Sequence, residues 1–481
     1  MSIGRLGVIG AAFAWVVLFP AMSPSAEESA PTPREKMLLD KVTELEKRVA
    51  ELEKRLSPEA PPPQPLPDVQ QRIEKGDETI QQQREKSPAD FRVFWKDGLR
   101  LETEDKRFAL RIGGRLQTDW AFFDQDRDLE RVLGDEEDGT EFRRARINLS
   151  GTIYHDVEYR TEYDFAGNSG KANFYDVYIG MKNIPALGTL RLGHFREPFG
   201  LERLTSVGHI TFMERALPNA FTPGRNVGLM GFNSAFDDRV TWAVGAYKNT
   251  DNFPSGDDAD EDQGYAVTGR VTALPWYQDD GGKLLHVGVA YSHRNPDGAV
   301  LGYGTRPEAH LGRQWVTTEG YGGFRLRDAR MDDVDLWGGE ALLIYGPLSL
   351  QGEYMRANVD TTFLGRHDFD GYYVQASYFL TGEHRAYTPS SGLPGRIKPK
   401  SNFSLSGERG WGAWELALRY STIDLDDRII RGGQQDDFTA GVSWYLNPNA
   451  KIMWNYVLAD IDHDLYAGNL DIFETRFQID F

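Results

Sequence analysis

DIFETRFQIDF, the last eleven residues of the chain (471–481), alternates between two kinds of side chain up to its final phenylalanine. Successive side chains of a strand point to opposite faces, so one face is apolar apart from a threonine and the other is charged or polar. The first face carries Phe473, Thr475, Phe477, Ile479 and Phe481, and the second carries Glu474, Arg476, Gln478 and Asp480. A soluble strand can also alternate, but charges on one face of segment after segment require a wet interior. The stretch therefore favours a transmembrane β-barrel.

The same alternation recurs along the chain from Phe108 onward, most clearly in WELALRY (414–420) and LSLQGEYM (348–355). Counting such segments predicts an all-β transmembrane barrel of about sixteen antiparallel strands, an even number, as is usual in bacterial barrels. The predicted strands start near residues 108, 141, 156, 172, 188, 226, 239, 264, 284, 334, 348, 370, 411, 436, 450 and 470.

The connections between these strands alternate in length. Tight turns are expected at 237–238, 346–347 and 447–448, with longer acidic loops after the intervening strands. Short periplasmic turns and long external loops are typical of outer-membrane barrels. Two connections depart from this pattern: 381–410 is long although it lies on the short-turn side, and 195–225 is rich in Phe, Leu, Ile and Met. Because 195–225 is too apolar to lie in water, we expect it to fold into the lumen.

Composition agrees with a barrel and excludes other classes. The chain has 21 Tyr, 26 Phe, 11 Trp and 50 Gly, no Cys, and a net charge of -19. Absence of cysteine fits an oxidising compartment, and an acidic chain does not favour binding to nucleic acid. No HExxH or GxSxG motif and no paired nucleophile and base are found, so no enzyme, cofactor or metal site is predicted.

The N-terminal region predicts three segments before the barrel. An apolar run behind Arg5 and a small-residue stretch indicate a signal peptide over 1–26. Residues 27–57 are expected to form an α-helical coiled-coil stalk, although a short solvated helix is the alternative. Its heptad positions are Leu38, Val42, Leu45, Val49, Leu52 and Leu56. Residues 58–90 are a Pro- and Gln-rich linker, and 91–481 are the barrel.

Several motifs resemble the phosphate-selective porin O and P family of Gram-negative outer membranes. The resemblance covers nearly all of the chain after residue 91, and the 191–221 stretch, which begins RLGHFREPFG, is the most specific part of it. It is also carried by residues 97–120, 141–151 (EFRRARINLSG), 162–167, 395–403 (GRIKPKSNF) and 410–425. The resemblance implies a sixteen-stranded, usually trimeric barrel that conducts anions.

The resemblance also implies pore-lining residues, namely Arg115, Arg143, Arg144 and Arg215, with Asp176 as an acidic partner. Strand periodicity places Arg144 and Arg146 on the lumen face and Arg143 on the lipid face, so we prefer Arg146 to Arg143. Guanidinium groups suit the task because they stay charged and give oxyanions two parallel hydrogen bonds. The predicted anion-binding set is Arg115, Arg144, Arg146, Arg191, Arg215, Arg306, Arg313 and Asp176.

Alternatives to a selective anion pore remain open. Individual arginines could instead form structural salt bridges with Glu158, Glu162, Asp164 or Asp176. Residues 303–316 supply only two arginines, which puts tight phosphate selectivity in doubt. The protein could therefore be a general porin, or a structural tether to the cell wall. Expected partners are small anions such as phosphate, outer-membrane lipid and lipopolysaccharide bridged by ions on acidic runs 135–138 and 257–262, and two further copies in a homotrimer.

Overall fold

The computed structural model describes residues 41, 43–48, 50–51, 91–166, 172–250, 264–296, 299–319, 330–406 and 410–481. The chain divides into two units, Met1–Glu85 and Lys86–Phe481, and the second holds the strands. In the first unit, residues 43–48 and 50–51 are helical and exposed. The signal peptide, the linker and the rest of the predicted stalk lie outside the described residues. The coiled coil is therefore not supported, since its seam needs a partner helix.

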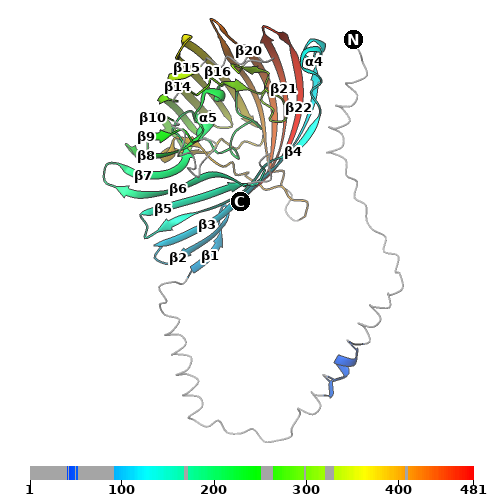
Figure 1. Cartoon of the computed structure of the whole chain (residues 1–481). Helices are drawn as coiled ribbons and strands as arrows, with labels where there is room; N and C mark the ends of the chain where they lie inside the picture. Colours follow the sequence, from blue (N-terminus) through cyan, green and yellow to red (C-terminus); the bar gives the residue numbers. More distant parts are fainter. Residues whose placement is uncertain are drawn as a thin grey trace, which may run out of the picture. The chain divides into compact units, whose positions relative to one another are not determined.

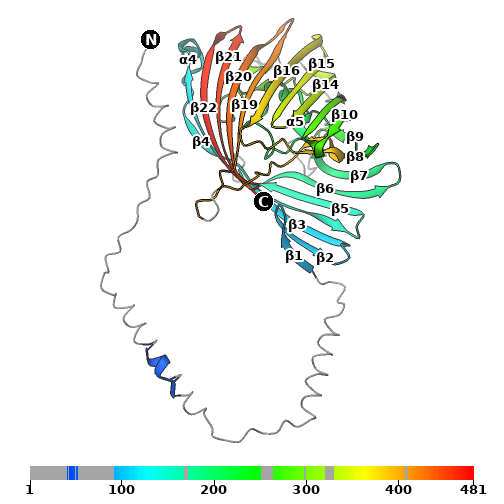
Figure 2. The same cartoon turned by 180° about the vertical axis from the view of Figure 1, so that it is seen from behind.

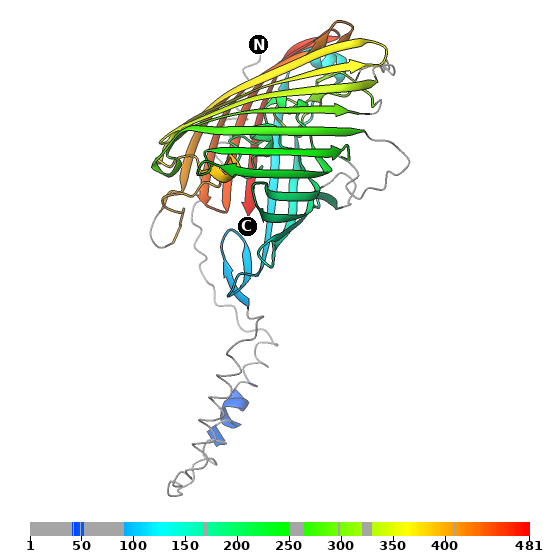
Figure 3. The same cartoon turned by 90° about the vertical axis from the view of Figure 1, so that its left-hand side faces the viewer.

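Sixteen antiparallel strands form a closed barrel, as the alternating pattern predicts (Figure 1). Each strand pairs with its neighbours in chain order, and β22 pairs with β3 to complete the ring. Figure 2 and Figure 3 show the wall from two other directions. The barrel strands are β3 (Phe108–Gln125), β4 (Gly139–Ile153), β5 (Val157–Asp164), β6 (Asn173–Ile184), β7 (Gly188–Arg196), β8 (Arg225–Ala235), β9 (Val240–Lys248), β10 (Tyr265–Gln278), β11 (Lys283–Asn295), β14 (Met331–Tyr345), β15 (Leu348–Thr361), β16 (Gly365–Phe379), β19 (Ala413–Asp427), β20 (Ile430–Asn447), β21 (Ala450–His463) and β22 (Tyr466–Asp480).

The barrel is apolar outside and charged inside, the reverse of a soluble protein. On β19, Leu418 is 52% exposed whereas its neighbour Arg419 is 1% exposed. On β22, Ile479 is 53% exposed whereas Arg476 is 0% exposed. Outward apolar side chains match a hydrocarbon surround, and inward charges require the polar interior predicted from the alternation. Among the described helices, none is long and apolar enough to cross a membrane.

Connection lengths agree with the prediction only in part. The tight turns are present, with positive φ at Asp237, Asp238 and Gly346. On the opposite end of the barrel, however, β16, β20 and β22 begin at residues 365, 430 and 466, before the predicted 370, 436 and 470. Three connections expected to be long are therefore short: 362–364, 428–429 and 464–465. The polar residues at the start of β16, β20 and β22 resemble a loop in sequence, but they belong to the strands.

Residues 197–224 fold into the lumen, as their apolar composition predicts. This segment contains α5 (Leu201–Leu204), which lies inside the ring of strands in Figure 1, and the 3-10 turn η1 (Leu217–Phe221). The carboxylate of Glu353 on β15 accepts the backbone N–H groups of Leu201 and Glu202, each at 2.7 Å. Phe212 is fully buried, and the carbonyl of Met213 accepts from Arg476 on β22. The segment thus spans the interior between distant strands.

Two further connections also enter the barrel. Between β11 and β14, Glu308 accepts from Arg419 at 2.9 Å and from Ser421 at 2.5 Å. Between β16 and β19, Arg385 pairs with Glu415 and Arg396 pairs with Asp480. The small elements of the connections are α4 (Arg127–Leu133), η2 (Asp279–Gly281), β12 (Gly304–Thr305), β13 (Val316–Thr317), β17 (Tyr387–Thr388), η3 (Pro389–Ser391) and β18 (Leu393–Pro394). Length alone does not reveal that these connections turn inward.

A hairpin that the alternation did not indicate precedes the barrel. It consists of β1 (Phe91–Trp95) and β2 (Leu99–Thr103), and β2 pairs with the start of β3. Phe481 lies where this hairpin meets the closing seam: its backbone exchanges hydrogen bonds with Gly114 at 2.7 and 3.0 Å. A Cβ at Gly114 would lie 2.7 Å from the Phe481 ring, so only glycine lets the ring sit there. The C-terminal residue is therefore part of the seam.

Deleting Phe481, or replacing it with Lys, should leave unassembled chain in the periplasm. Deletion removes the terminal hydrogen bonds of the seam between β22 and β3, and both changes remove the outward ring. The measurement is the heat-modifiable, folded band in the outer-membrane fraction. Phe363→Lys, at an exposed aromatic in the turn between β15 and β16, is the matched control and should assemble. Normal folded barrel in the Phe481 variants would contradict this role.

Candidate functional site

A cavity of about 520 Å³ lies inside the barrel against the wall formed by β3 to β10. Its lining is strongly basic: nine arginines against the acids Glu162, Asp176 and Asp480. The arginines are Arg111, Arg115, Arg146, Arg160, Arg191, Arg196, Arg225, Arg270 and Arg396. Rings of like charge in a narrow passage focus potential, so this cavity is the candidate pore.

A second cavity of about 330 Å³ lies between the inserted segments 197–224 and 299–319. Its arginines are Arg143, Arg203, Arg215 and Arg306, and its acids are Glu214 and Glu308. Arg203 lines this second cavity whereas the next residue, Leu204, lines the first. The short helix α5 therefore lies between the two cavities, and we call it the partition.

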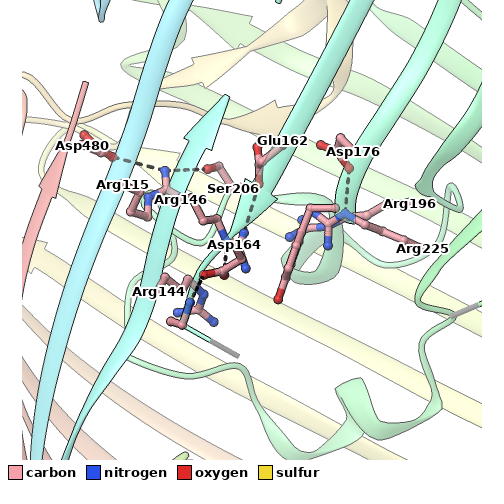
Figure 4. A network of polar contacts seen from close by, with 12 residues as sticks. Arg115, Arg144, Arg146, Glu162, Asp164, Asp176, Arg196, Ser206, Arg225 and Asp480 are labelled. Carbon is pink, nitrogen blue, oxygen red and sulfur yellow. Dashed lines mark hydrogen bonds and ion pairs between the residues drawn. The ribbon is translucent and has the colours of Figure 1, made fainter. Parts of the chain in front are cut away.

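Most arginines of the first cavity are paired with carboxylates from neighbouring strands (Figure 4). Arg115 lies 3.2 Å from Asp480, and Arg146 lies 2.6 Å from Asp164 and 3.3 Å from Glu162. These pairs confirm that structural salt bridges account for part of the arginine set. Removing one partner of a buried pair leaves the other charge uncompensated, which costs far more than the pair itself contributes.

The same holds farther along the wall, where Asp176 and Glu158 are the acceptors. Arg225 lies 2.7 Å from Asp176, Arg160 lies 3.4 Å from it, and Arg191 lies 2.8 Å from Glu158. Asp176 thus holds two guanidiniums at the cavity wall, in keeping with the acidic partner that the family resemblance implies. Arg160 also pairs with Glu162, so these two carboxylates together compensate Arg160 and Arg225.

Two arginines bracket the partition without a carboxylate among their hydrogen-bond acceptors in the described structure. Arg196, in the first cavity, donates to the carbonyl oxygens of Arg203, Leu204 and Thr205. Arg215, in the second cavity, donates to those of Glu202, Arg203 and Thr205 at 3.0 to 3.3 Å. Carbonyl oxygens stabilise a guanidinium but do not cancel its charge. Guanidinium groups therefore lie on both sides of α5.

Burial and like charges act on the partition arginines together. Desolvation, followed by the nearby Arg203 charge, lowers the pKa of Arg215 to about 9. That pKa still leaves the guanidinium protonated at neutral pH, as expected for an arginine. His209, in the same inserted segment, has its pKa lowered well below the usual value by burial and by the Arg115 charge, so its ring is neutral. In the segment 197–224, Arg215 therefore carries a positive charge at neutral pH and His209 does not.

The structure places the eight predicted residues in three environments. Arg115, Arg146, Arg191 and Asp176 line the first cavity, and Arg215 and Arg306 line the second. Arg144 is buried, donates to Gln117 at 2.7 Å and lines neither cavity. Arg313 pairs with Glu136 and donates to the carbonyls of Leu133 and Asp135, so its guanidinium serves the loop around α4. Arg144 and Arg313 therefore line neither of the two cavities.

The periodicity argument was wrong for Arg143. The register of β3 with β4 shifts between Gln117 and Thr118, which pair with Arg144 and Phe142, so Arg143 is an extra residue in a bulge. A bulge interrupts the alternation of faces. Arg143 consequently turns inward, where it lies 2.8 Å from Glu214 and lines the second cavity. The family resemblance, which included Arg143, placed it correctly.

Six arginines of the first cavity were missing from the predicted set, and one of them is Arg111, which shares the lumen face of β3 with Arg115. Arg160 shares the face of Glu158 and Glu162 on β5, a signal that was available in the sequence. Arg196 and Arg225 pair in register at the ends of β7 and β8, where the chain leaves the wall, so strand parity could not place them. The others, Arg270 and Arg396, belong to β10 and to an inserted segment. Among the described residues, no group of three or more His, Asp or Glu side chains is arranged to hold a metal ion.

Comparisons with known proteins bear on the whole barrel. Porin O of Pseudomonas aeruginosa is 30% identical over 408 residues, which cover 78% of this chain and 88% of that protein. An uncharacterized protein of Caulobacter vibrioides is 28% identical over 379 residues, covering 76% of this chain and 71% of that protein. Among solved structures, an anion-selective porin from Comamonas acidovorans aligns with a TM-score of 0.47 at 14% identity, covering 78% of this chain and all of that one.

The family assignment rests on a match to most of the chain together with the closed barrel. Residues 110–481 match the profile of the family described as phosphate-selective porin O and P. That span contains the sixteen barrel strands, apart from the first two residues of β3, and both cavities. The chain is therefore a bacterial outer-membrane porin and belongs to the phosphate-selective porin O and P family.

Proposed function

We propose that this porin lets small anions, phosphate among them, diffuse passively across the outer membrane along a path that joins the two cavities. The observation that carries the proposal is the position of Arg196 and Arg215. They lie on either side of the α5 partition, and their guanidiniums are held by carbonyl oxygens rather than neutralised by carboxylates. An anion that crosses the partition passes from one guanidinium to the other.

The charges that line the lumen, rather than the net charge of -19, set the preference of the channel for anions over cations. Acids in external loops are open to solvent, and salt screens them beyond a Debye length of about 8 Å at physiological ionic strength. The partition arginines are buried, so their field is screened less and is focused by the low-dielectric wall. The sign of these lumen charges therefore decides which ions enter, and an acidic protein can carry an anion pore.

The same contacts argue for weak and distributed binding. Carboxylates already occupy Arg115, Arg146 and Arg191, so few guanidinium edges are free to grip a phosphate in bidentate fashion. A conducting site must also release its ion, which favours several modest contacts over one strong contact. We therefore assign the protein to general anion transport with phosphate as one permeant ion.

Assembly is the second part of the proposal. Heptad positions over residues 34–56 favour parallel self-association, and porins of this family are expected to be trimers. Closed cyclic symmetry would allow three such helices to pair with one another. The acidic run at 135–138 lies in the connection after α4, where divalent ions could bridge it to lipopolysaccharide.

Arg196→Ala and Arg215→Ala should each lower the chloride-over-potassium permeability ratio by about threefold, since each removes one weakly screened charge beside the path. Reversal potentials in a potassium chloride gradient across a planar bilayer give the ratio. Arg215→Lys keeps the charge and should retain most of the selectivity. The matched control is Arg131→Ala, an exposed arginine of α4 paired with Asp128. A cation-selective wild-type channel would defeat the proposal.

Removing residues 34–56 should leave a trimer of reduced thermal stability, because the barrels are expected to set the number of copies and the helix to reinforce it. Native mass measurement of the detergent-solubilised protein, with and without the segment, tests this. If the shortened protein is monomeric, the stalk alone assembles the oligomer, and the trimer expected from the barrel is wrong.

A further inference from the structure

One part of the pore wall is apolar, which the passage of inorganic ions does not require. Tyr178, Phe195, Met230 and Phe232 lie on the lumen face of β6, β7 and β8, and all four line the cavity of about 520 Å³. Phe195 and Met230 pack together in one cluster, with Tyr178 and Phe232 partly buried against it. The lumen of a porin is usually polar at such positions. We call these four residues, which are three aromatic rings and one methionine, the aromatic patch.

The inserted segments add apolar side chains to the same cavity. Leu204 comes from α5 at the partition, and Leu393 comes from β18 in the connection between β16 and β19. Both side chains are only half-buried. The cavity therefore combines apolar contributions from the wall and from two inserted segments with the arginines already described. Sites for small organic molecules combine apolar surface with polar groups, and this mainly charged cavity offers apolar surface on one side.

Cationic groups lie directly beside the aromatic patch. The guanidinium carbon of Arg191 lies 4.0 Å from the ring centre of Tyr178 and 4.8 Å from that of Phe232. Arg160 pairs in register with Tyr178 across β5 and β6. The patch thus places planar cations at the edge of an apolar surface. A molecule that has a negative group and an apolar body finds a complement for each part.

We propose that this cavity binds organic anions, namely carboxylates or phosphonates that carry an aromatic or other apolar body. The inference rests on the proposed anion conduction and names the substrate class of the same pore. The acid group contacts the Nη1 atoms of Arg160 and Arg191, which make no hydrogen bond in the described structure, and the body contacts the aromatic patch. The cavity volume of about 520 Å³ falls within the range of small-molecule sites, roughly 300 to 1,000 Å³, and exceeds what an inorganic anion needs.

The apolar body of the ligand should strengthen binding to the aromatic patch by a measurable amount. Moving apolar surface from water onto Phe232 and Tyr178 is favourable, and offset stacking of rings adds to it. Arg191 already stacks on both rings, so an aromatic ligand meets a surface whose cation is held in place by Glu158. The contact is open on the cavity side, which lets the ligand leave again, as transport requires.

The test compares two anions of the same headgroup and different body in planar-bilayer recordings of the full-length protein. Phenylphosphonate and methylphosphonate are added to a chloride-conducting channel, and the concentration that halves the current is measured for each. Phenylphosphonate should block at about tenfold lower concentration. In Phe232→Ser the two values should come within about twofold of each other, whereas Phe232→Tyr should keep the difference.

Phe123→Ser is the matched control. Phe123 is a partly buried aromatic of β3 that packs on a different apolar cluster and does not line this cavity, so the tenfold difference should persist. Equal block by both phosphonates in an anion-selective wild-type channel would overturn the inference and leave the proposed function standing. A cation-selective channel would instead overturn the proposed function. A difference that survives unchanged in folded Phe232→Ser would also overturn the assignment to the aromatic patch.

Discussion

Hydrogen-bonded closure of β22 on β3 is the constraint on which the rest of this structure depends. A sheet in hydrocarbon cannot leave an edge, because each unpaired N–H or C=O there costs several kcal/mol. The pairing runs from Leu470 with Gln125 to Asp480 with Arg115 and leaves the ring without an open side. Once the ring is closed, every second side chain must face inward. The charged interior is a consequence of that geometry.

The interior is organised by ion pairs and carboxylates alongside buried apolar clusters between the inserted segments and the wall. Glu353 caps the start of α5, Glu308 holds the segment between β11 and β14, and Arg476 holds the carbonyl of Met213. These contacts are buried, where electrostatic attraction is strong and an unpaired group is costly. Two connections are thereby fixed against the wall, and the two cavities described above lie on either side of α5.

Much of the barrel follows from the sequence because the two-residue period is strict wherever one face meets lipid. Strand number, closure and the inward course of 195–225 all follow from that period and from composition. The period fails at three kinds of place. At Arg143 a bulge adds a residue, so parity gives the wrong face.

At the ends of β7 and β8, Arg196 and Arg225 belong to chain that is leaving the wall, so its alternation no longer applies. The partners of an inserted arginine such as Arg396 come from residues far away in the chain, which no local pattern encodes. The site was therefore predictable where it lies on regular strands, and not where loops contribute to it.

Arg196 and Arg215 reach the carbonyl oxygens of Arg203 and Thr205 from opposite cavities. The two cations repel each other, and the oxygens between them keep both in position. The two guanidinium groups that attract an anion therefore also stabilise the α5 turn beside its path. Ion selectivity and channel width therefore depend on the same two residues. In evolution, a substitution of either arginine changes both properties together.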